Sequence, residues 1–353
     1  MTGSERFGTV HDAIHLQRTV AASLGSPLLG RLLEAMEADL DAGGPCHDLL
    51  EGVSDRPTHD AVPLRLLGGV HRLVLDGQAP ELARFYPSAG GDPDAPGDLG
   101  RTFLATIGSH VEELQGAMRR TVQTNEVGRA TVLAGGFAEV GRRTGLPLRI
   151  REIGASAGLL LRWDHFHYAP EGAPEAGDRS SPLRFDGSWW EGPAPGLTGA
   201  RVVDRRGCDI APIDPTSTEG SLTLQSFVWP DQLDRLDRLR AAIAVARDVP
   251  AVVDAADAGE WLERELAERP AGAATVVYHS IVWQYLSDRT RQRIKSALRD
   301  AGANAADAAV AWLRMEPAGA TADLRLTLWP GGETQVLATC GYHGRPVRWG
   351  QAA

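Results

Sequence analysis

The feature that most constrains the fold is a strand-like run followed directly by a turn of small residues. Residues 148–152 read Leu-Arg-Ile-Arg-Glu, and residues 153–158 read Ile-Gly-Ala-Ser-Ala-Gly before three leucines. A short β run, a tight Gly-rich turn and an apolar run predict a strand, a loop and a helix. No comparable run occurs before residue 148. We therefore expect the sheet to begin there.

Helical periodicity dominates the first 144 residues. Apolar side chains recur at helical spacing, and clusters of Pro and Gly separate the runs. We expect an all-helical N-terminal domain over residues 1–144, with helices at 14–24, 28–40, 62–75, 103–118 and 130–140.

From residue 145 onward, strand-like runs alternate with helical runs, which predicts parallel strands joined by crossover helices. A turn containing Pro-Gly-Gly separates two further runs, which predict a terminal antiparallel hairpin. Residues 165–220, rich in Gly, Pro and Trp, read as an insertion into a domain that covers 145–353. The expected strands are 148–153, 222–229, 251–253, 274–278, 309–313, 323–328 and 334–340, and the expected helices are 232–247, 259–268 and 288–301.

Composition excludes several classes of function. The chain has 353 residues, of which 43% are hydrophobic, enough for a large core and two domains. Its net charge of −10, without an Arg-rich patch interleaved with aromatics, argues against nucleic acid as a partner. The three cysteines lie far apart, which argues against a disulfide framework and a Cys-type metal site. With neither a membrane-length apolar run nor a signal-peptide core, we expect a cytoplasmic protein without a membrane partner.

The Gly-rich turn has two interpretations that exclude each other. An acid followed by this turn resembles the first motif of class I S-adenosylmethionine (SAM)-dependent methyltransferases. A side chain at Gly154 or Gly158 would crowd a ligand, and the next helix would present free N–H groups to the ligand's carboxylate end. The resemblance implies that Glu152 meets the ammonium of SAM and that Gly154, Ala155, Ser156 and Gly158 line the cofactor.

Read as Gly-x-Ser-x-Gly, the same turn is similar to the nucleophile elbow of α/β-hydrolases. Ser156 would then be the nucleophile, His343 the base and Asp323 the acid. Against this, the turn follows the first strand-like run rather than a later one, and no His-Gly-Gly-Gly-type oxyanion segment precedes it. A turn that only packs tightly is the third interpretation. The order of elements favours the cofactor.

A resemblance to one family covers most of the chain and rests on five stretches taken together. They are residues 123–129 (Gln-Thr-Asn-Glu-Val-Gly-Arg), 152–159, 206–212, 227–232 and 279–286. On these residues the chain resembles an uncharacterised bacterial family, domain of unknown function 2332, in the methyltransferase-like Rossmann superfamily. The resemblance implies an α/β, Rossmann-like class I methyltransferase fold, with a parallel sheet and a C-terminal antiparallel hairpin, preceded by the helical domain.

The methyltransferase resemblance also implies roles for acids further along the chain. An acid at the end of the second strand would bind the ribose of SAM, and Asp231 fits if residues 222–229 form that strand. Asp204 is the alternative. An acid after the third strand would contact adenine, and Asp254 and Asp257 compete for that role. For Asp231 and Asp257 the competing interpretation is a helix N-cap.

The expected fourth strand ends at residues 278–280, the edge that faces the transferred methyl group in methyltransferases. His279 is the expected general base because its unperturbed pKa is near neutral, and a buried structural histidine is the competing interpretation. Ser280 is an expected cofactor contact, and Tyr285 an expected catalytic side chain. Glu126 is expected to touch substrate or cofactor unless it stabilises a helix terminus.

The expected function is SAM-dependent methyl transfer to a small molecule. One alternative is a catalytically inactive SAM-binding or regulatory protein of the same fold. The second alternative is an esterase-like hydrolase that uses Ser156.

Overall fold

The computed structural model describes residues 8–305 and 308–350, and within them the chain forms two compact units. The first, called here the helical unit, combines the described part of Met1–Thr124 with Ser217–Asp237. The second, the sheet unit, combines Asn125–Thr216 with the described residues from Arg238 on. The first division therefore falls after Thr124, whereas the sequence predicts a boundary after residue 144.

The helical unit is built around α4 (Val62–Leu75), most of which is buried. Two adjacent glycines of α4 allow close packing. A Cβ on Gly68 would lie 2.8 Å from the ring of Phe227, and one on Gly69 would lie 2.8 Å from Ala117. The other α-helices of this unit are α1 (Val10–Ser23), α2 (Pro27–Ala42), α3 (Pro45–Leu50), α5 (Pro80–Ala83), α6 (Leu99–Ser109), α7 (Val111–Met118) and α9 (Thr218–Ser226).

The sheet unit contains an eight-stranded mixed sheet with the order β11-β10-β9-β8-β7-β1-β5-β6. Five neighbouring strands, β6, β5, β1, β7 and β8, are parallel. Beyond them, β8, β9, β10 and β11 pair antiparallel in succession. The expected α/β class and the terminal hairpin are confirmed. The strands are β1 (Leu148–Ile153), β5 (Val202–Asp209), β6 (Val252–Ala255), β7 (Ala274–Ser280), β8 (Val310–Ala318), β9 (Thr321–Trp329), β10 (Glu333–Cys340) and β11 (Val347–Trp349).

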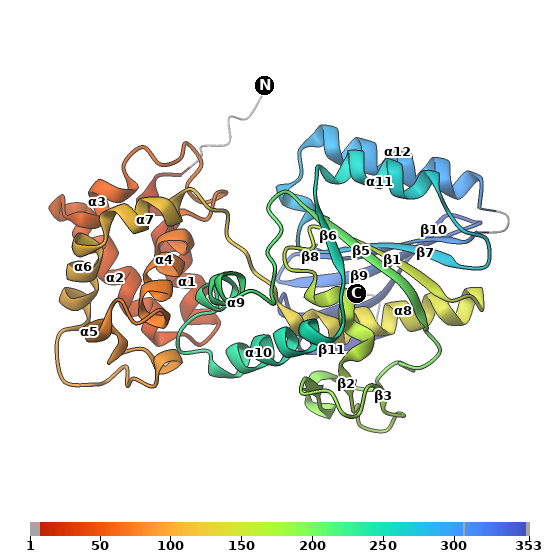
Figure 1. The fold of residues 1–353 in the computed structure, drawn as a ribbon, viewed down its shortest axis with the longest axis horizontal. Coiled ribbons are helices and arrows are strands. Elements are labelled where there is room, and N and C mark those ends of the chain that lie inside the picture. The colour runs from red at the N-terminus through yellow and green to blue at the C-terminus, as the bar shows by residue number, and fades with distance from the viewer. Residues whose placement is uncertain (1–7, 306–307, 351–353) are drawn as a thin grey trace. The chain divides into compact units, whose positions relative to one another are not determined.

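Helices cover both faces of this sheet (Figure 1). The helix α8 (Ala130–Thr144) packs on one face, against β7, β8 and β9. On the other face, α11 (Ala258–Ala267) contacts β5, and α12 (Asp288–Ala303) contacts β8 and β9. The helix α10 (Leu233–Asp248) precedes β6 in the chain. No helix in residues 8–305 and 308–350 is both long and apolar enough to cross a membrane.

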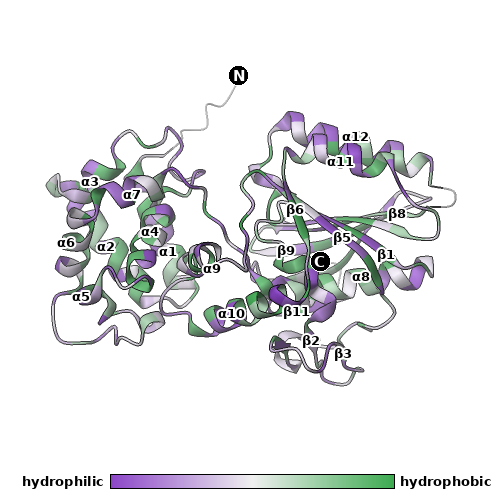
Figure 2. Cartoon of the chain, viewed as in Figure 1, coloured by the Kyte–Doolittle hydropathy of each residue, from purple (hydrophilic) through white to green (hydrophobic). Residues whose placement is uncertain are grey.

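The prediction of the second strand is wrong. Residues 222–229, expected as a strand, fall largely in α9 of the helical unit. The second strand is β5, which lies inside the expected insertion. Charged residues interrupt the apolar pattern of β5, and Figure 2 shows how hydrophilic this strand is. The rest of the insertion includes a small sheet of β2 (His167–Tyr168), β3 (Ala176–Gly177) and β4 (Arg184–Phe185).

Asp231 therefore does not stand at the end of a sheet strand. Its carboxylate accepts hydrogen bonds from Ser26 Oγ at 2.5 Å and from the backbone N of Leu28 at 3.0 Å. Leu28 lies in the first turn of α2, whose N–H groups have no partner within the helix. Asp231 is thus a helix-capping residue supplied from a distant part of the chain.

Replacing this cap tests the assignment. We expect Asp231→Ala to lower the free energy of unfolding by about 1–2 kcal/mol, because Leu28 N and Ser26 Oγ lose their acceptor. Urea titration followed by circular dichroism measures the change. Asp231→Asn should lose less, because its amide oxygen still accepts from Leu28 N. Equal stability of all three proteins would contradict a capping role.

Candidate functional site

The strand order of the sheet unit reverses between β1 and β7. Counted along the chain, the parallel strands lie in the order 3-2-1-4-5, as in doubly wound nucleotide-binding sheets. In such sheets, ligands bind outside the carboxyl ends of the strands at the point of reversal. Here these ends are Ile153 of β1 and Ser280 of β7. The candidate site is therefore this edge of the sheet.

The turns after β1 and β7 each contain a residue with an unfavourable backbone conformation. Ser156 and Ile281 both have φ of 52°, which is rare for residues with a side chain and most costly for a β-branched one. Ser156 N donates to Asp209 Oδ2 at 2.8 Å, and Ile281 N donates to the carbonyl of Met315 at 2.9 Å. Such strain costs about 1–3 kcal/mol and is concentrated at functional sites.

The glycines of the turn after β1 are required by packing within the protein. Gly154 and Gly158 have positive φ values of 68° and 65°. A Cβ on Gly154 would lie 2.5 Å from Val282, and one on Gly158 would lie 2.8 Å from Val253. Valines of the protein thus occupy the positions that the sequence analysis gave to the ligand. A side chain at either glycine would disturb the fold before it could affect a ligand.

The segment after this turn also differs from the prediction. Instead of an α-helix, residues Leu159–His165 form a short 3-10 helix, η3, with non-helical backbone angles at Arg162. The N-terminus of a regular helix, expected to face the ligand's carboxylate, is therefore not formed there. Ala155 is buried, and its N donates to the carbonyl of Cys208 at 3.0 Å. The turn is thus fixed to the neighbouring strand β5.

Glu152, next to last in β1, is a buried carboxyl group with one side-chain hydrogen bond to the rest of the described chain. Its side chain is 3% exposed, and Tyr278 Oη donates to its Oε2 at 3.0 Å. Burial raises the pKa of Glu152 to about 8, although the Tyr278 bond and the charges of Arg162 and Arg129 act in the opposite direction. At neutral pH most of this carboxyl group is therefore protonated in the absence of a ligand.

Aromatic packing holds Tyr278 in place. The ring of Phe137 in α8 meets the Tyr278 ring edge-on at 5.0 Å. Phe137 also stacks on Trp163 of η3, with ring centroids 4.7 Å apart. Burial raises the pKa of Tyr278 well above its ordinary value, so its hydroxyl remains a donor. These contacts fix the position of the hydrogen bond that Glu152 receives.

Arg129 connects the end of β7 to the segment before α8. Its Nη1 donates to the carbonyl of Ser280 at 3.1 Å, and its Nε donates to the carbonyl of Tyr342 at 3.0 Å. Glu126 accepts from Gly128 N at 3.1 Å and caps the 3-10 helix η2 (Val127–Arg129). Ser280 and Arg129 therefore lie together at the candidate site. The hydrogen bond that Glu126 accepts from Gly128 fits the interpretation that Glu126 stabilises a helix terminus.

His279 is a buried, hydrogen-bonded histidine, as the competing structural interpretation expects. It alternates with Tyr278 along β7 and so lies on the opposite face of the sheet. It is fully buried, its Nδ1 is 2.6 Å from Glu316 Oε1, and Trp312 Nε1 donates to its Nε2 at 3.1 Å. Because both ring nitrogens are engaged, this geometry does not support the expected general base. Tyr285, in the next loop, is 57% exposed.

The two acids that compete for the adenine contact, Asp254 and Asp257, both accept hydrogen bonds from groups of the protein. Asp257 caps α11 by accepting from the N atoms of Gly259 and Glu260, and it also accepts from Thr290 Oγ1 at 2.8 Å. Asp254 accepts from Arg206 Nε at 2.6 Å and from Trp261 Nε1 at 2.7 Å. For Asp257, the helix-cap interpretation is confirmed.

The acid at the end of the true second strand is Asp209, which the sequence analysis did not assign to the cofactor. Its two oxygens accept from Ser156 N at 2.8 Å and from Ala211 N at 2.9 Å. Asp209 therefore stabilises the strained turn after β1. It was missed because β5 itself was missed, since the strand lies inside the segment that the sequence indicates as an insertion.

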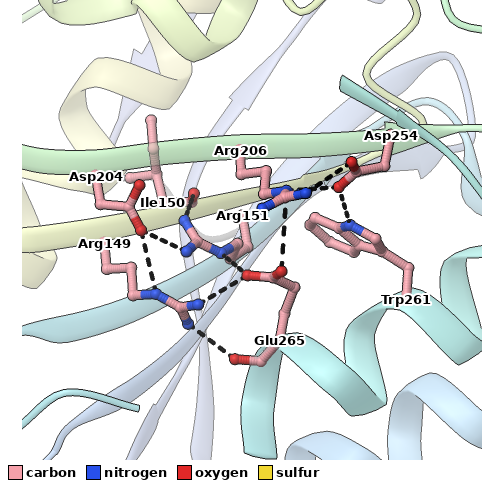
Figure 3. A network of polar contacts seen from close by, with 8 residues as sticks. All are labelled: Arg149, Ile150, Arg151, Asp204, Arg206, Asp254, Trp261 and Glu265. Atoms are coloured by element: carbon pink, nitrogen blue, oxygen red, sulfur yellow. Dashed lines mark hydrogen bonds and ion pairs between the residues drawn. The ribbon is translucent and has the colours of Figure 1, made fainter. Parts of the chain in front are cut away.

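The alternative ribose acid, Asp204, lies within β5 and belongs to a network of charges on the α11 face (Figure 3). Glu265 of α11 accepts from Arg149 Nη2 at 2.7 Å and from Arg151 Nε at 2.5 Å. Asp204 pairs with the same two arginines. Arg206, itself bound to Asp254, extends the network. Asp204 therefore has a structural role in the middle of the sheet.

The geometry gives the hydrolase interpretation little support. In the described part of the chain, no three His, Cys, Asp or Glu side chains group as metal ligands would. Positive φ at Ser156 also suits a strained nucleophile elbow. However, Asp323, the acid of the proposed triad, accepts from Arg325 Nη2 at 2.8 Å.

The charge network predicts a large effect from one deletion. We expect Glu265→Ala to lower the free energy of unfolding by about 3 kcal/mol, because it leaves buried Arg149 and Arg151 without their main counter-charge. Glu268→Ala, which removes an exposed acid next to the same helix, should change it by less than about 0.5 kcal/mol. Urea unfolding measures both, and equal effects would contradict the role of the network.

The raised pKa of Glu152 predicts a pH-dependent effect of Glu152→Gln. Below pH 4.5 the carboxyl group is protonated in the folded and unfolded states and contributes no difference. As pH rises from 4.5 to about 8, only the unfolded state loses the proton, so the folded state loses stability, by roughly 5 kcal/mol in full. Glutamine does not titrate and still accepts from Tyr278. The variant should therefore gain stability relative to wild type across this range, and a constant difference would contradict the assignment.

Comparison with known proteins supports the family part of the resemblance, and it does not support the methyltransferase superfamily. The model of the family described as "Uncharacterized protein conserved in bacteria (DUF2332)" matches residues 11–349. No curated protein and no solved structure matches the chain. Since the family match covers nearly all of the chain, this protein belongs to the DUF2332 family of uncharacterised bacterial proteins.

Proposed function

We propose that the sheet unit binds SAM at the carboxyl ends of β1 and β7 and transfers its methyl group to a small molecule. The observation that carries the proposal is Glu152, a buried carboxyl group at the point where the strand order reverses. Strained turns flank it at Ser156 and Ile281. Buried ionisable groups with shifted pKa values, located beside strained backbone, are typical of ligand sites.

Each residue at this edge has a part in the proposal. SAM would supply a methyl group that its sulfonium already activates. Glu152 would hold the ammonium of the ligand, and Tyr278 would keep the carboxyl group oriented. Arg129 and Ser280 would border the methyl acceptor at the end of β7. The protein would act mainly by alignment and by excluding water.

A second candidate is a SAM-binding or regulatory protein without catalysis. One observation favours it, namely that His279 is fully buried with both ring nitrogens engaged. Methyl acceptors that need a base would then lack the expected one. The two candidates share the ligand and differ only in turnover.

Calorimetric titration with SAM and S-adenosylhomocysteine tests the shared part. At about pH 8.5, where Glu152 is largely ionised, we expect binding that Glu152→Gln weakens about tenfold, or roughly 1.4 kcal/mol, because an ammonium loses its counter-charge. Asp231→Asn, in the helical unit, should leave the affinity unchanged. Absence of binding to the wild-type protein at millimolar ligand would overturn the proposal.

Turnover separates the two candidates. The wild-type protein is incubated with SAM and a panel of small-molecule acceptors, and formation of S-adenosylhomocysteine is measured. Product formation that depends on one acceptor supports the methyltransferase. Binding without product across the panel supports the second candidate.

A further inference from the structure

Arg162 is a buried arginine that the sequence analysis did not single out. It lies in η3 and is 3% exposed. Its Nε donates to the carbonyl of Val249 at 2.7 Å, and its Nη1 donates to the carbonyl of Gly158 at 2.7 Å. Among the described residues, Nη2 has no hydrogen-bond partner, and no carboxylate forms an ion pair with this guanidinium.

This leaves a positive charge inside the sheet unit without direct compensation. Burial lowers the pKa of Arg162 to about 10, and the positive charge of Arg205 adds to the effect. Arg162 therefore remains charged at neutral pH. Arg205 has its own partner, because Asp164 binds it with two hydrogen bonds of 2.7 and 2.9 Å. Removing a charge from water without a partner costs several kcal/mol.

Glu152 is the complementary group. Its Oε2 accepts from Tyr278, and among the described residues its Oε1 has no hydrogen-bond partner. Glu152 and Arg162 are close enough to attract each other, yet they form no ion pair. A buried carboxyl group and a buried guanidinium thus face the same region of the sheet, and each retains a polar atom without a hydrogen-bond partner among the described residues.

We propose that Arg162 and Glu152 bind the two charges of a zwitterionic ligand, with its carboxylate at Arg162 Nη2 and its ammonium at Glu152 Oε1. The ligand class is an α-amino acid, or a larger molecule that ends in one. A charge-assisted hydrogen bond from an arginine to a carboxylate is about twice as strong as a neutral one. A zwitterion satisfies both buried groups at once, whereas a ligand with one charge leaves the other group unpaired.

This inference rests on the proposed location of the ligand site, and it adds the anionic contact. It also gives the site a preference that a binding measurement can detect. S-Adenosylhomocysteine carries the amino-acid end, and 5′-methylthioadenosine is a related nucleoside thioether without it. Any difference between their affinities reports on the amino-acid end.

The first experiment is calorimetric titration of the full chain with both nucleosides. We expect the wild-type protein to bind S-adenosylhomocysteine at least about tenfold more tightly, and Arg162→Met to lose this preference while its affinity for 5′-methylthioadenosine changes by less than about twofold. Arg162→Lys should restore part of the preference. Arg179→Met, which removes an exposed arginine of the same unit, is the matched control. A preference that survives in Arg162→Met overturns the proposal.

The second experiment needs no variant and covers the case in which Arg162→Met fails to fold. The wild-type protein is titrated by NMR with three probes. L-Methionine carries both charges, methioninamide carries only the ammonium, and 4-(methylthio)butanoate carries only the carboxylate. We expect clear binding of L-methionine alone at millimolar concentration. Equal binding of the three probes, or no binding of any, overturns the inference. If neither nucleoside binds but L-methionine does, the proposed SAM function fails and the amino-acid site stands.

Discussion

The need to compensate buried charge in the central strand determines much of the sheet unit. The strand β1 places Arg149, Arg151 and Glu152 inside the protein, where an isolated charge is far more costly than in water. Strand alternation directs the two arginines to one face and Glu152 to the other. On the first face Glu265 and Asp204 complete the pairing. On the second face, Glu152 has a hydrogen bond from Tyr278 and only a more distant positive charge at Arg162. The charge of an ionised Glu152 is therefore only partly compensated.

This difference between the faces separates structural from candidate functional residues. On the α11 face, each arginine of β1 has carboxylate partners, and His279 lies between Glu316 and Trp312. The arginines of β1 are therefore paired within the protein on this face. On the face of Glu152, polar atoms without partners lie beside two strained turns. Chemistry is expected where the protein has left its own groups unsatisfied.

The sequence predicted most strands of the sheet and failed where charged residues interrupt the apolar pattern of a strand. The strand β7 was found because its apolar and β-branched residues outweigh its other polar ones, and β1 because its apolar residues alternate with charged ones just before the Gly-rich turn. The strand β5 was missed because Asp204, Arg205 and Arg206 occupy its middle, which only the partners in the folded protein explain. That error moved the second strand to the α9 segment and made Asp231 a ribose candidate. Arg162 carried no local signal, since its burial depends on contacts with Gly158 and Val249.

The segment Ser217–Asp237 has a consequence for how the chain is synthesised. It belongs to the helical unit, yet it is encoded between β5 and β6 of the sheet unit. Phe227, which fills the space beside Gly68 of α4, therefore leaves the ribosome about a hundred residues after the rest of that unit. The buried core of the helical unit comes from residues between Ile14 and Met118, and Trp229 of the later segment packs against it. The contacts of Phe227 and Trp229 can form during translation only after strands β1 to β5 of the other unit have been made, which interleaves the folding of the two units in time.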